Sequence, residues 1–162
     1  MDAKAEHHEE KHVRVEDNVL VRGLGRYAAD APLPNQAYAF FVRSPHAFAK
    51  ILSVDVSAAL KAPGVIGVLT AKDMEGVGNL GRHPPVPGRG GKNLVLPHRP
   101  ALAGERVMHI GEPVAMVVAD TFAAAQDAGE FVTVEYEETT PVIDAREALR
   151  DGAPQVWPQA QS

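Results

Sequence analysis

The sequence contains no cysteine. This absence excludes disulfide bonds, and it excludes thiolate ligation of a metal ion or an iron–sulfur cluster within the chain. An excess of positive charge is also lacking, because 16 Lys and Arg stand against 21 Asp and Glu and the net charge is -5 at pH 7. A chain of this charge offers no strongly basic surface, so we expect neither a nucleic acid nor an anionic membrane as a partner.

Long apolar runs are absent as well, since none approaches the ~20 residues of a transmembrane helix. The first residues, MDAKAEHHEEKH, are charged where a signal peptide would carry an apolar core. We therefore expect a cytoplasmic protein without a membrane span. What is present is a hydrophobic fraction of 45% in 162 residues, which is enough for one domain with a core.

The clearest secondary-structure signal lies in residues 110–138, which read as strand, helix, strand. Pro113 has no N–H to donate, so it fits best at the first residue of a strand, and the apolar run 114–119 follows it. Apolar and polar residues then alternate over 132–137, which predicts a second strand with one buried face. We interpret this stretch as a β-α-β unit.

The helix of that unit is predicted at 121–130. Asp120 or Thr121 can cap its start, and the alanines of FAAAQDAG favour it. Gly129 either ends the helix or permits close packing inside its last turn. The sequence alone leaves both roles of Gly129 open.

Other short apolar or alternating runs, bounded by turn residues, predict further elements. Strands are expected near 36–43, 50–56 and 65–70, and helices near 57–62 and 144–150. A turn or loop, SPHAFAK, joins the first two of these strands, which could pair with each other. The predicted fold class is α+β, with a small mixed or antiparallel sheet.

Residues 1–12 are polar on every side and are expected to form a disordered charged tail. His8, Glu9 and His12 within them match H-E-x-x-H, the pattern of a zinc hydrolase. That chemistry needs a helix packed into a core and a third ligand, so a solvated tail is favoured. A zinc site at these histidines is the alternative.

A second motif, Gly23-x-Gly25-x-x-Ala28, resembles a dinucleotide-binding loop. Such a loop must open a helix that faces the pyrophosphate, but Pro32 and Pro34 follow and block helix propagation. A glycine turn in an extended segment is therefore predicted. Similarly, His46 could act as a ligand or an acid–base group, but a lone histidine in a loop is more often structural or solvated.

From residue 74 to 106 the chain is rich in glycine and proline and offers no long regular element. Loops of this length commonly contact another molecule, so we expect an interface. The run Gly-Arg-Gly-Gly-Lys at 88–92 hints at phosphate binding, but Val86 and Asn93 stand where a P-loop needs Gly and Ser or Thr. A solvated basic turn is the favoured interpretation of that run.

The last ten residues, 153–162, are predicted to form an extended tail. Trp157 is the only tryptophan and stands near prolines in a segment that suits neither a helix nor a central strand. Its large apolar side chain needs a surface to cover it. We expect this tail to be an interface with another polypeptide.

Ordered short motifs along the chain resemble a known family. They are R-x-E-D at 14–17, G-x-G-R-Y at 23–27, S-P-H-A at 44–47, P-G-V at 63–65, T-A-x-D at 70–73, G-E-P-V-A at 111–115 and D-A-x-E-x-V-x-V-x-Y-E at 127–137. In this order they resemble the molybdenum hydroxylases, which include xanthine dehydrogenase, aldehyde oxidase and aerobic carbon monoxide dehydrogenase. The resemblance covers nearly the whole chain and implies the α/β-hammerhead domain, here at 13–152.

The resemblance implies a component of a molybdopterin-dependent oxidoreductase that oxidises aldehydes, N-heterocycles or carbon monoxide. The family's catalytic and cofactor-binding residues lie in later domains, so no catalytic, cofactor-binding or metal residue is carried over to this chain. Molybdopterin–molybdenum and 2Fe-2S, with or without FAD, would belong to the assembled complex. Packing or interface roles are expected for Gly111, Glu112, Pro113 and Trp157.

The implied partners are a molybdopterin-binding large polypeptide and an iron–sulfur subunit, with or without an FAD subunit. In that complex this chain would be a non-catalytic subunit or fragment that supplies scaffold and interface. The alternative hypothesis is a free-standing binding module of the same fold for small molecules or proteins. In that case the segment 74–106 would shape the rim of a pocket.

Overall fold

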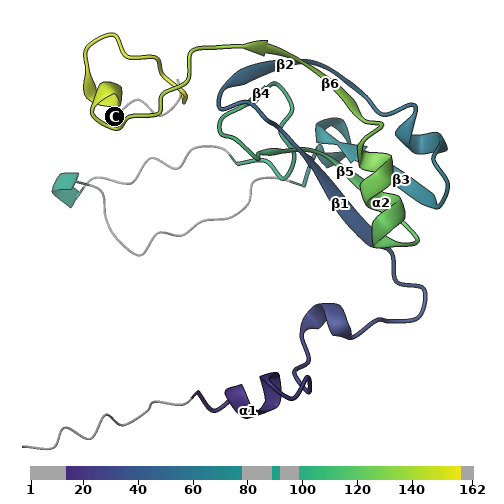
Figure 1. Cartoon of the computed structure of the whole chain (residues 1–162). Helices are drawn as coiled ribbons and strands as arrows, with labels where there is room; N and C mark the ends of the chain where they lie inside the picture. The colour runs from purple at the N-terminus through teal and green to yellow at the C-terminus, as the bar shows by residue number, and fades with distance from the viewer. Residues whose placement is uncertain (1–13, 78–88, 92–98, 158–162) are drawn as a thin grey trace, which may run out of the picture. The chain divides into compact units, whose positions relative to one another are not determined.

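The computed structural model describes residues 14–77, 89–91 and 99–157 (Figure 1). The chain forms two compact units, with the boundary between Gln36 and Ala37. The sequence analysis placed 13–152 in one domain and did not mark this boundary. The expected charged tail, including His8 and His12, lies outside the described residues.

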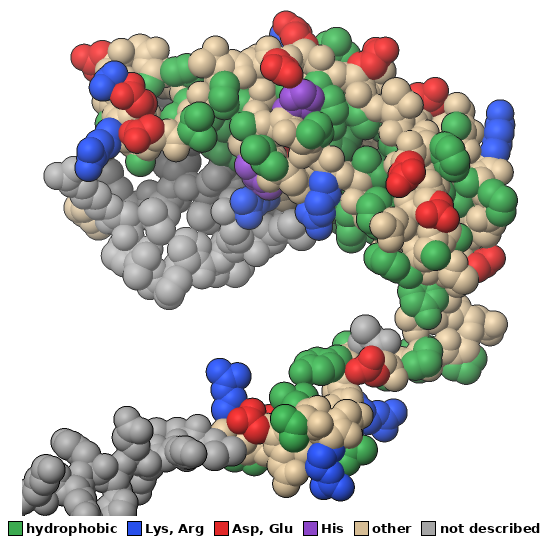
Figure 2. All heavy atoms as spheres, in the orientation of Figure 1, with side chains coloured by type: hydrophobic (Ala, Val, Ile, Leu, Met, Phe, Trp, Pro, Cys, Tyr) green, Lys and Arg blue, Asp and Glu red, His purple; other side chains and the backbone are tan. Residues whose placement is uncertain are grey.

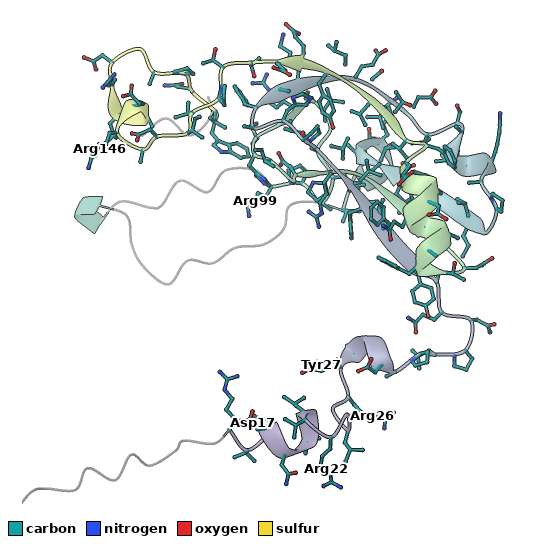
Figure 3. The ribbon with its side chains drawn as sticks, viewed as in Figure 1. Asp17, Arg22, Arg26, Tyr27, Arg99 and Arg146 are labelled. Atoms are coloured by element: carbon teal, nitrogen blue, oxygen red, sulfur yellow. The ribbon has the colours of Figure 1, made fainter. Side chains whose placement is uncertain are left out.

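The N-terminal unit contains helix α1 (Asp17–Leu20) and the 3₁₀ helix η1 (Ala28–Asp30). Hydrophobic side chains reach its surface (Figure 2), and the side chains of Arg22 and Arg26 project from its ribbon (Figure 3). The first helix after Gly25 in the described chain is only three residues long. A glycine turn therefore describes this stretch better than a dinucleotide-binding loop.

In the described part of the second unit, the strands form two three-stranded antiparallel sheets. Sheet A has the order β1 (Tyr38–Arg43), β5 (Pro113–Ala119), β3 (Val65–Thr70), and sheet B the order β4 (Arg106–Val107), β2 (Ala49–Asp55), β6 (Thr133–Glu138). Helix α2 (Phe122–Gly129) packs on sheet A. The 3₁₀ helices are η2 (Ala59–Lys61), η3 (Ala71–Met74), η4 (Arg89–Gly91) and η5 (Glu147–Leu149).

Strand β5 lies in the middle of sheet A and carries buried side chains on both of its faces. Val117 packs in one core cluster with Ala128 of α2. Val114 packs in a second cluster with Val107 of β4. A strand covered on both faces has no need of polar alternation, which explains the continuous apolar run that predicted β5.

Helix α2 starts as the sequence indicated and ends at a glycine. The Thr121 hydroxyl accepts a hydrogen bond from the Ala124 N–H at 3.1 Å, so Thr121 rather than Asp120 caps the helix. A Cβ atom at Gly129 would lie 2.6 Å from Cδ1 of Phe40 in β1. The structure thus shows that Gly129 permits close packing between α2 and sheet A.

The predicted strands correspond to β1, β2, β3, β5 and β6, and the α+β antiparallel fold is confirmed. The strands on either side of α2 nevertheless belong to different sheets. Pairing of the first two strands is wrong, because β1 pairs with β5 and β2 pairs with β4 and β6. Each of these strands finds its partner far along the chain, where local sequence gives no signal.

The helices expected near 57–62 and 144–150 are the short 3₁₀ helices η2 and η5. A helix of one or two turns gains too few hydrogen bonds to offset the cost of nucleation, so a 3₁₀ turn is a common outcome. None of the helices in the described ranges is long and apolar enough to cross a membrane.

Candidate functional site

Two sequence motifs that lie far apart in the chain meet in the second unit. The Ser44 N–H donates to the Glu112 carbonyl at 2.9 Å, and the Gly111 N–H donates to the Ser44 carbonyl at 2.8 Å. The Arg43 guanidinium also donates to the Gly111 carbonyl, at 2.8 Å. We call this contact between the loop at 44–47 and the turn at 111–113 the loop-turn junction.

Ser44 organises the loop side of the junction from a buried position. Its hydroxyl accepts a hydrogen bond from the His46 N–H at 3.0 Å and donates to the His46 carbonyl at 3.3 Å. A serine hydroxyl that bonds the backbone two residues ahead fixes a tight turn. The S-P-H-A motif therefore sets the direction in which the chain leaves β1.

Glu112 organises the turn side and is only 7% exposed. Its carboxylate accepts a hydrogen bond from the Met108 N–H, and its own N–H donates to the His109 carbonyl at 3.3 Å. Gly111 has a φ of 81°, which favours glycine at this position. The G-E-P motif thus builds a closed turn whose buried carboxylate is used for backbone contacts.

Pro113 is the first residue of β5, as its missing N–H predicted. Its carbonyl accepts a hydrogen bond from the Ala103 N–H at 2.7 Å. This bond holds the chain just before β4 against the start of β5. Gly111, Glu112 and Pro113 are therefore brought together as parts of one packed turn.

Replacing Glu112 by Ala should lower the free energy of unfolding by about 1–2 kcal/mol, because the partly buried Met108 N–H would lose its acceptor. Glu112→Gln retains an acceptor oxygen and is expected to lose less. Urea denaturation of both variants measures the difference. Equal losses in the two variants would show that the charge, rather than the acceptor, stabilises the turn.

His46 connects the loop-turn junction to sheet B. Its Nδ1 lies 3.2 Å from Oε1 of Glu138, and its ring centroid lies 4.7 Å from that of Tyr136. Burial raises the pKa of the Tyr136 hydroxyl, and a hydrogen bond with Ser44 opposes this rise. Sequence reasoning missed Tyr136 and Glu138, because strand alternation gives no sign of a partner in a distant loop.

The contacts at the loop-turn junction hold two parts of the domain together. Over the described ranges, no group of three or more His, Cys, Asp or Glu is placed to hold a metal ion. The side chains of Ser44, Glu112 and His46 each contact the backbone or a neighbouring side chain. The arrangement ties sheet A to sheet B, and His46 takes part in it through its contacts with Glu138 and Tyr136.

Trp157 lies at the end of the described chain and is half-buried. Within the described part of the chain it makes no hydrogen bond, ion pair or ring contact, and it belongs to neither core cluster. The structure therefore does not bring Trp157 into the loop-turn junction. Its expected interface role stays a prediction.

The segment 74–106 is described only at 74–77, 89–91 and 99–106. Leu102 and Ala103 are buried within the domain itself. The expectation of an interface along the whole segment is therefore wrong at these two residues, because they complete the chain's own core. Of the run at 88–92, the structure describes only residues 89–91, which form η4. Gly88 and Lys92 lie outside the described residues.

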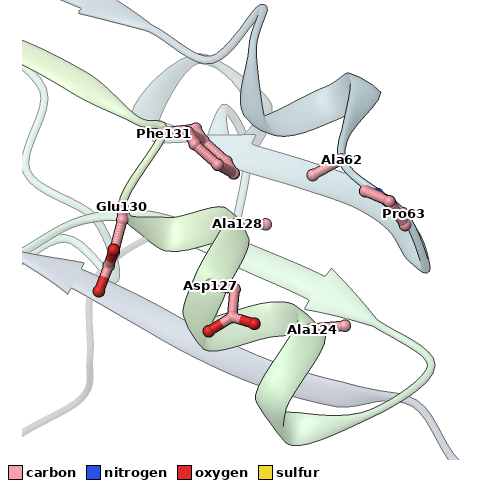
Figure 4. A pocket seen from close by; sticks show the side chains of 7 residues that line it. All are labelled: Ala62, Pro63, Ala124, Asp127, Ala128, Glu130 and Phe131. Atoms are coloured by element: carbon pink, nitrogen blue, oxygen red, sulfur yellow. The ribbon is translucent and has the colours of Figure 1, made fainter.

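A groove of about 550 Å³ lies between α2 and the two residues that follow η2 (Figure 4). It is lined by Ala62, Pro63, Ala124, Asp127, Ala128, Glu130 and Phe131. None of these residues comes from the segment 74–106, which the binding-module hypothesis invoked as a pocket rim. Its two charged side chains are both carboxylates, so the groove lacks the mixed polar groups that usually orient a small ligand.

Comparison with known proteins gives consistent results. Residues 22–140 match the family described as aldehyde oxidase and xanthine dehydrogenase, a/b hammerhead domain. The chain is 39% identical to the nicotine 6-hydroxylase large subunit of Paenarthrobacter nicotinovorans over 139 residues, covering 86% of this chain and 16% of that protein. It is also 39% identical to the carbon monoxide dehydrogenase large chain of Afipia carboxidovorans over 152 residues, covering 89% and 17%.

Solved structures agree with the sequence relatives. Quinoline 2-oxidoreductase from Pseudomonas putida 86 matches with a TM-score of 0.76 and 35% identity, covering 89% of this chain and 18% of that one. A Cu,Mo-CO dehydrogenase matches with a TM-score of 0.72 and 37% identity, covering 89% and 17%. The chain thus spans about a sixth of the length of these relatives. It belongs to the α/β-hammerhead domain family of aldehyde oxidase and xanthine dehydrogenase, within the large subunits of the molybdenum hydroxylases.

Proposed function

We propose that this chain is a non-catalytic hammerhead component of a molybdopterin-dependent oxidoreductase, supplying scaffold and an interface between subunits. The observation that supports this most directly is the loop-turn junction. Its family motifs, S-P-H-A and G-E-P-V-A, are engaged in contacts within the domain, and Glu112 uses its carboxylate on the Met108 N–H. Because the Glu112 carboxylate is only 7% exposed and already accepts a backbone hydrogen bond, its geometry supports a role in holding the shape of the domain.

The 2Fe-2S cluster implied by the family does not fit this chain's own residues. The sequence has no cysteine to ligate 2Fe-2S, and the described residues include no cluster suited to a metal ion. When bound in a complex, molybdopterin–molybdenum, 2Fe-2S and FAD supply oxidation and electron transfer. We propose that partner polypeptides hold them, namely a molybdopterin-binding polypeptide and an iron–sulfur subunit, with or without an FAD subunit.

The proposed substrates are aldehydes, N-heterocycles or carbon monoxide, acted on by the assembled enzyme. Support for this range comes from the relatives' names, which include a nicotine 6-hydroxylase and carbon monoxide dehydrogenases. This chain would provide a rigid contact surface for the polypeptide that acts on these substrates. A cytoplasmic location is part of the proposal.

Purification of the tagged chain from its native source tests the proposal. We expect a larger polypeptide containing molybdopterin and molybdenum to co-purify in a fixed ratio under gentle conditions. Mass spectrometry identifies it by the remaining large-subunit domains, and metal analysis measures its molybdenum. Recovery of the chain as a lone monomer would overturn the proposal.

Trp157→Ala should weaken association with that polypeptide by a factor of ten or more, or roughly 1.4 kcal/mol. The indole is half-buried and anchored by no hydrogen bond in the described chain, and covering it would remove on the order of 200 Å² from water. Titration of labelled chain measures the dissociation constant. Phe131→Ala, at an exposed aromatic side chain, is the control and should change it less.

The melting temperature of the isolated Trp157→Ala variant distinguishes an interface role of Trp157 from packing on the chain's own core. An unchanged melting temperature is expected if this side chain serves the interface. Unfolding of Trp157→Ala in isolation would instead place the indole on the chain's own core. If neither association nor stability changes, the tail is a frayed end.

A further inference from the structure

Residues 14–36, called here the N-terminal arm, are ordered but bury none of their described side chains. Seven large apolar side chains of the arm are exposed, among them Val15, Leu24, Tyr27 and Leu33. Such a density of exposed apolar surface in so short a segment is unusual for a side of a protein that faces only water. The arm therefore has the composition of a contact surface.

Local bonds fix the shape of the arm without help from a core. The Val21 N–H donates to the Asp17 carbonyl at 2.9 Å, and the Leu24 N–H donates to the Val19 carbonyl at 3.0 Å. The Leu33 N–H donates to the Gln36 side-chain oxygen, also at 2.9 Å. Because these bonds already order the backbone, the arm would lose little conformational entropy when it binds.

A close contact inside the arm also indicates that its shape is fixed. A Cβ atom at Gly25 would lie 2.7 Å from Cδ2 of Leu20, so the leucine side chain lies directly over the glycine. Tyr27 lies next to this position, since one of its ring atoms would be 3.8 Å from the same Cβ. Leu20, Gly25 and Tyr27 thus form a small preformed apolar patch.

The charges of the arm cancel. Three arginines stand against three carboxylates over 14–36, namely Arg14, Arg22, Arg26 and Glu16, Asp17, Asp30. Asp30 is further engaged by the Tyr27 N–H at 2.9 Å. A neutral segment gains little from long-range attraction, so apolar contact rather than net charge would carry its binding.

We propose that the N-terminal arm docks on an apolar surface of the polypeptide that supplies the rest of the large subunit. This inference rests on the proposed function. The length of the relatives argues for that occupant, because this chain covers only 16% and 17% of the first two, and about five sixths of each protein lies outside the match. The solved relatives cover 89% of this chain, so the matched region extends into the arm.

The test uses the full chain and the molybdenum-containing polypeptide that co-purifies with it. The double variant Leu24→Ser, Leu33→Ser removes two exposed leucines of the arm. The double variant Leu60→Ser, Leu149→Ser removes two exposed leucines of the second unit and is the matched control. The arm variant should raise the dissociation constant at least tenfold, while the control stays close to the wild type.

Two further readouts check the apolar mechanism. The melting temperature of the isolated arm variant should equal that of the wild type. The factor by which the arm variant raises the dissociation constant should change little between low and high salt, because the arm carries no net charge.

Each other outcome overturns the inference. Equal weakening by both double variants would indicate unspecific apolar adhesion. A lowered melting temperature of the isolated arm variant would show that the arm packs on its own second unit. If the wild type binds the polypeptide and the arm variant binds equally well, the inference fails while the proposed function stands; if the wild type does not bind, the proposed function itself fails.

Discussion

Leu102→Ala is expected to lower the free energy of unfolding by about 2–5 kcal/mol. Leu102 is 2% exposed and is among the largest fully buried side chains, although it lies outside every helix and strand. The adjacent Ala103 N–H donates to the Pro113 carbonyl at 2.7 Å, which holds this stretch against β5. Removing the side chain would leave a cavity that an anchored backbone cannot close. Urea denaturation followed by circular dichroism measures the loss.

Leu149→Ala is the matched control for this prediction. The same atoms are removed, but Leu149 is 87% exposed. A surface leucine in that position should change the free energy of unfolding by no more than about 0.5 kcal/mol. Similar effects at the two leucines would contradict the assignment of Leu102 to the core, and would restore the interface interpretation of the segment 74–106 at this residue.

Gly129→Val is expected to destabilise the chain by about 2–3 kcal/mol. A Cβ atom at this position would lie 2.6 and 2.7 Å from two ring carbons of Phe40. That ring cannot easily retreat, because it packs with the core cluster and contacts Phe122 edge to face at 6.4 Å between centroids. The helix would therefore have to move away from sheet A. The melting temperature and the urea midpoint report the loss.

Gly67→Val makes the same chemical change in β3 and should have a much smaller effect. A Cβ atom at Gly67 meets no atom within 4 Å, and valine is favoured in strands. A double-mutant cycle with Phe40→Leu then tests the proposed contact directly. The smaller side chain should recover part of the loss at Gly129, and an additive result would mean that the clash lies elsewhere.

These two predictions bear on function through the shape of the domain. Residues 99–105 and helix α2 hold the two ends of β5, the strand in the middle of sheet A. The loop-turn junction leads directly into the same strand through Pro113. In the proposed scaffold role, loss of stability at either position would reduce the amount of complex without changing the reaction of the complex that remains.

The sequence by itself determined the local elements and the family. The apolar run 114–119 and the alternation at 132–137 predicted β5 and β6, and Pro113 marked the first residue of β5. These features depend on neighbours within a few residues, so their physics is visible in a single sequence. The ordered motifs identified the hammerhead domain, and the match over residues 22–140 confirmed it.

Tertiary structure alone decided which distant segments meet. It divided the strands between two sheets, placed the Glu112 carboxylate on the Met108 N–H, and set Gly129 against the ring of Phe40. It also buried Leu102 in a stretch whose glycines and prolines predicted an exposed interface. Each of these outcomes depends on contacts between residues far apart in the chain, and periodicity or propensity within one segment carries no information about the partner that packing will bring to it.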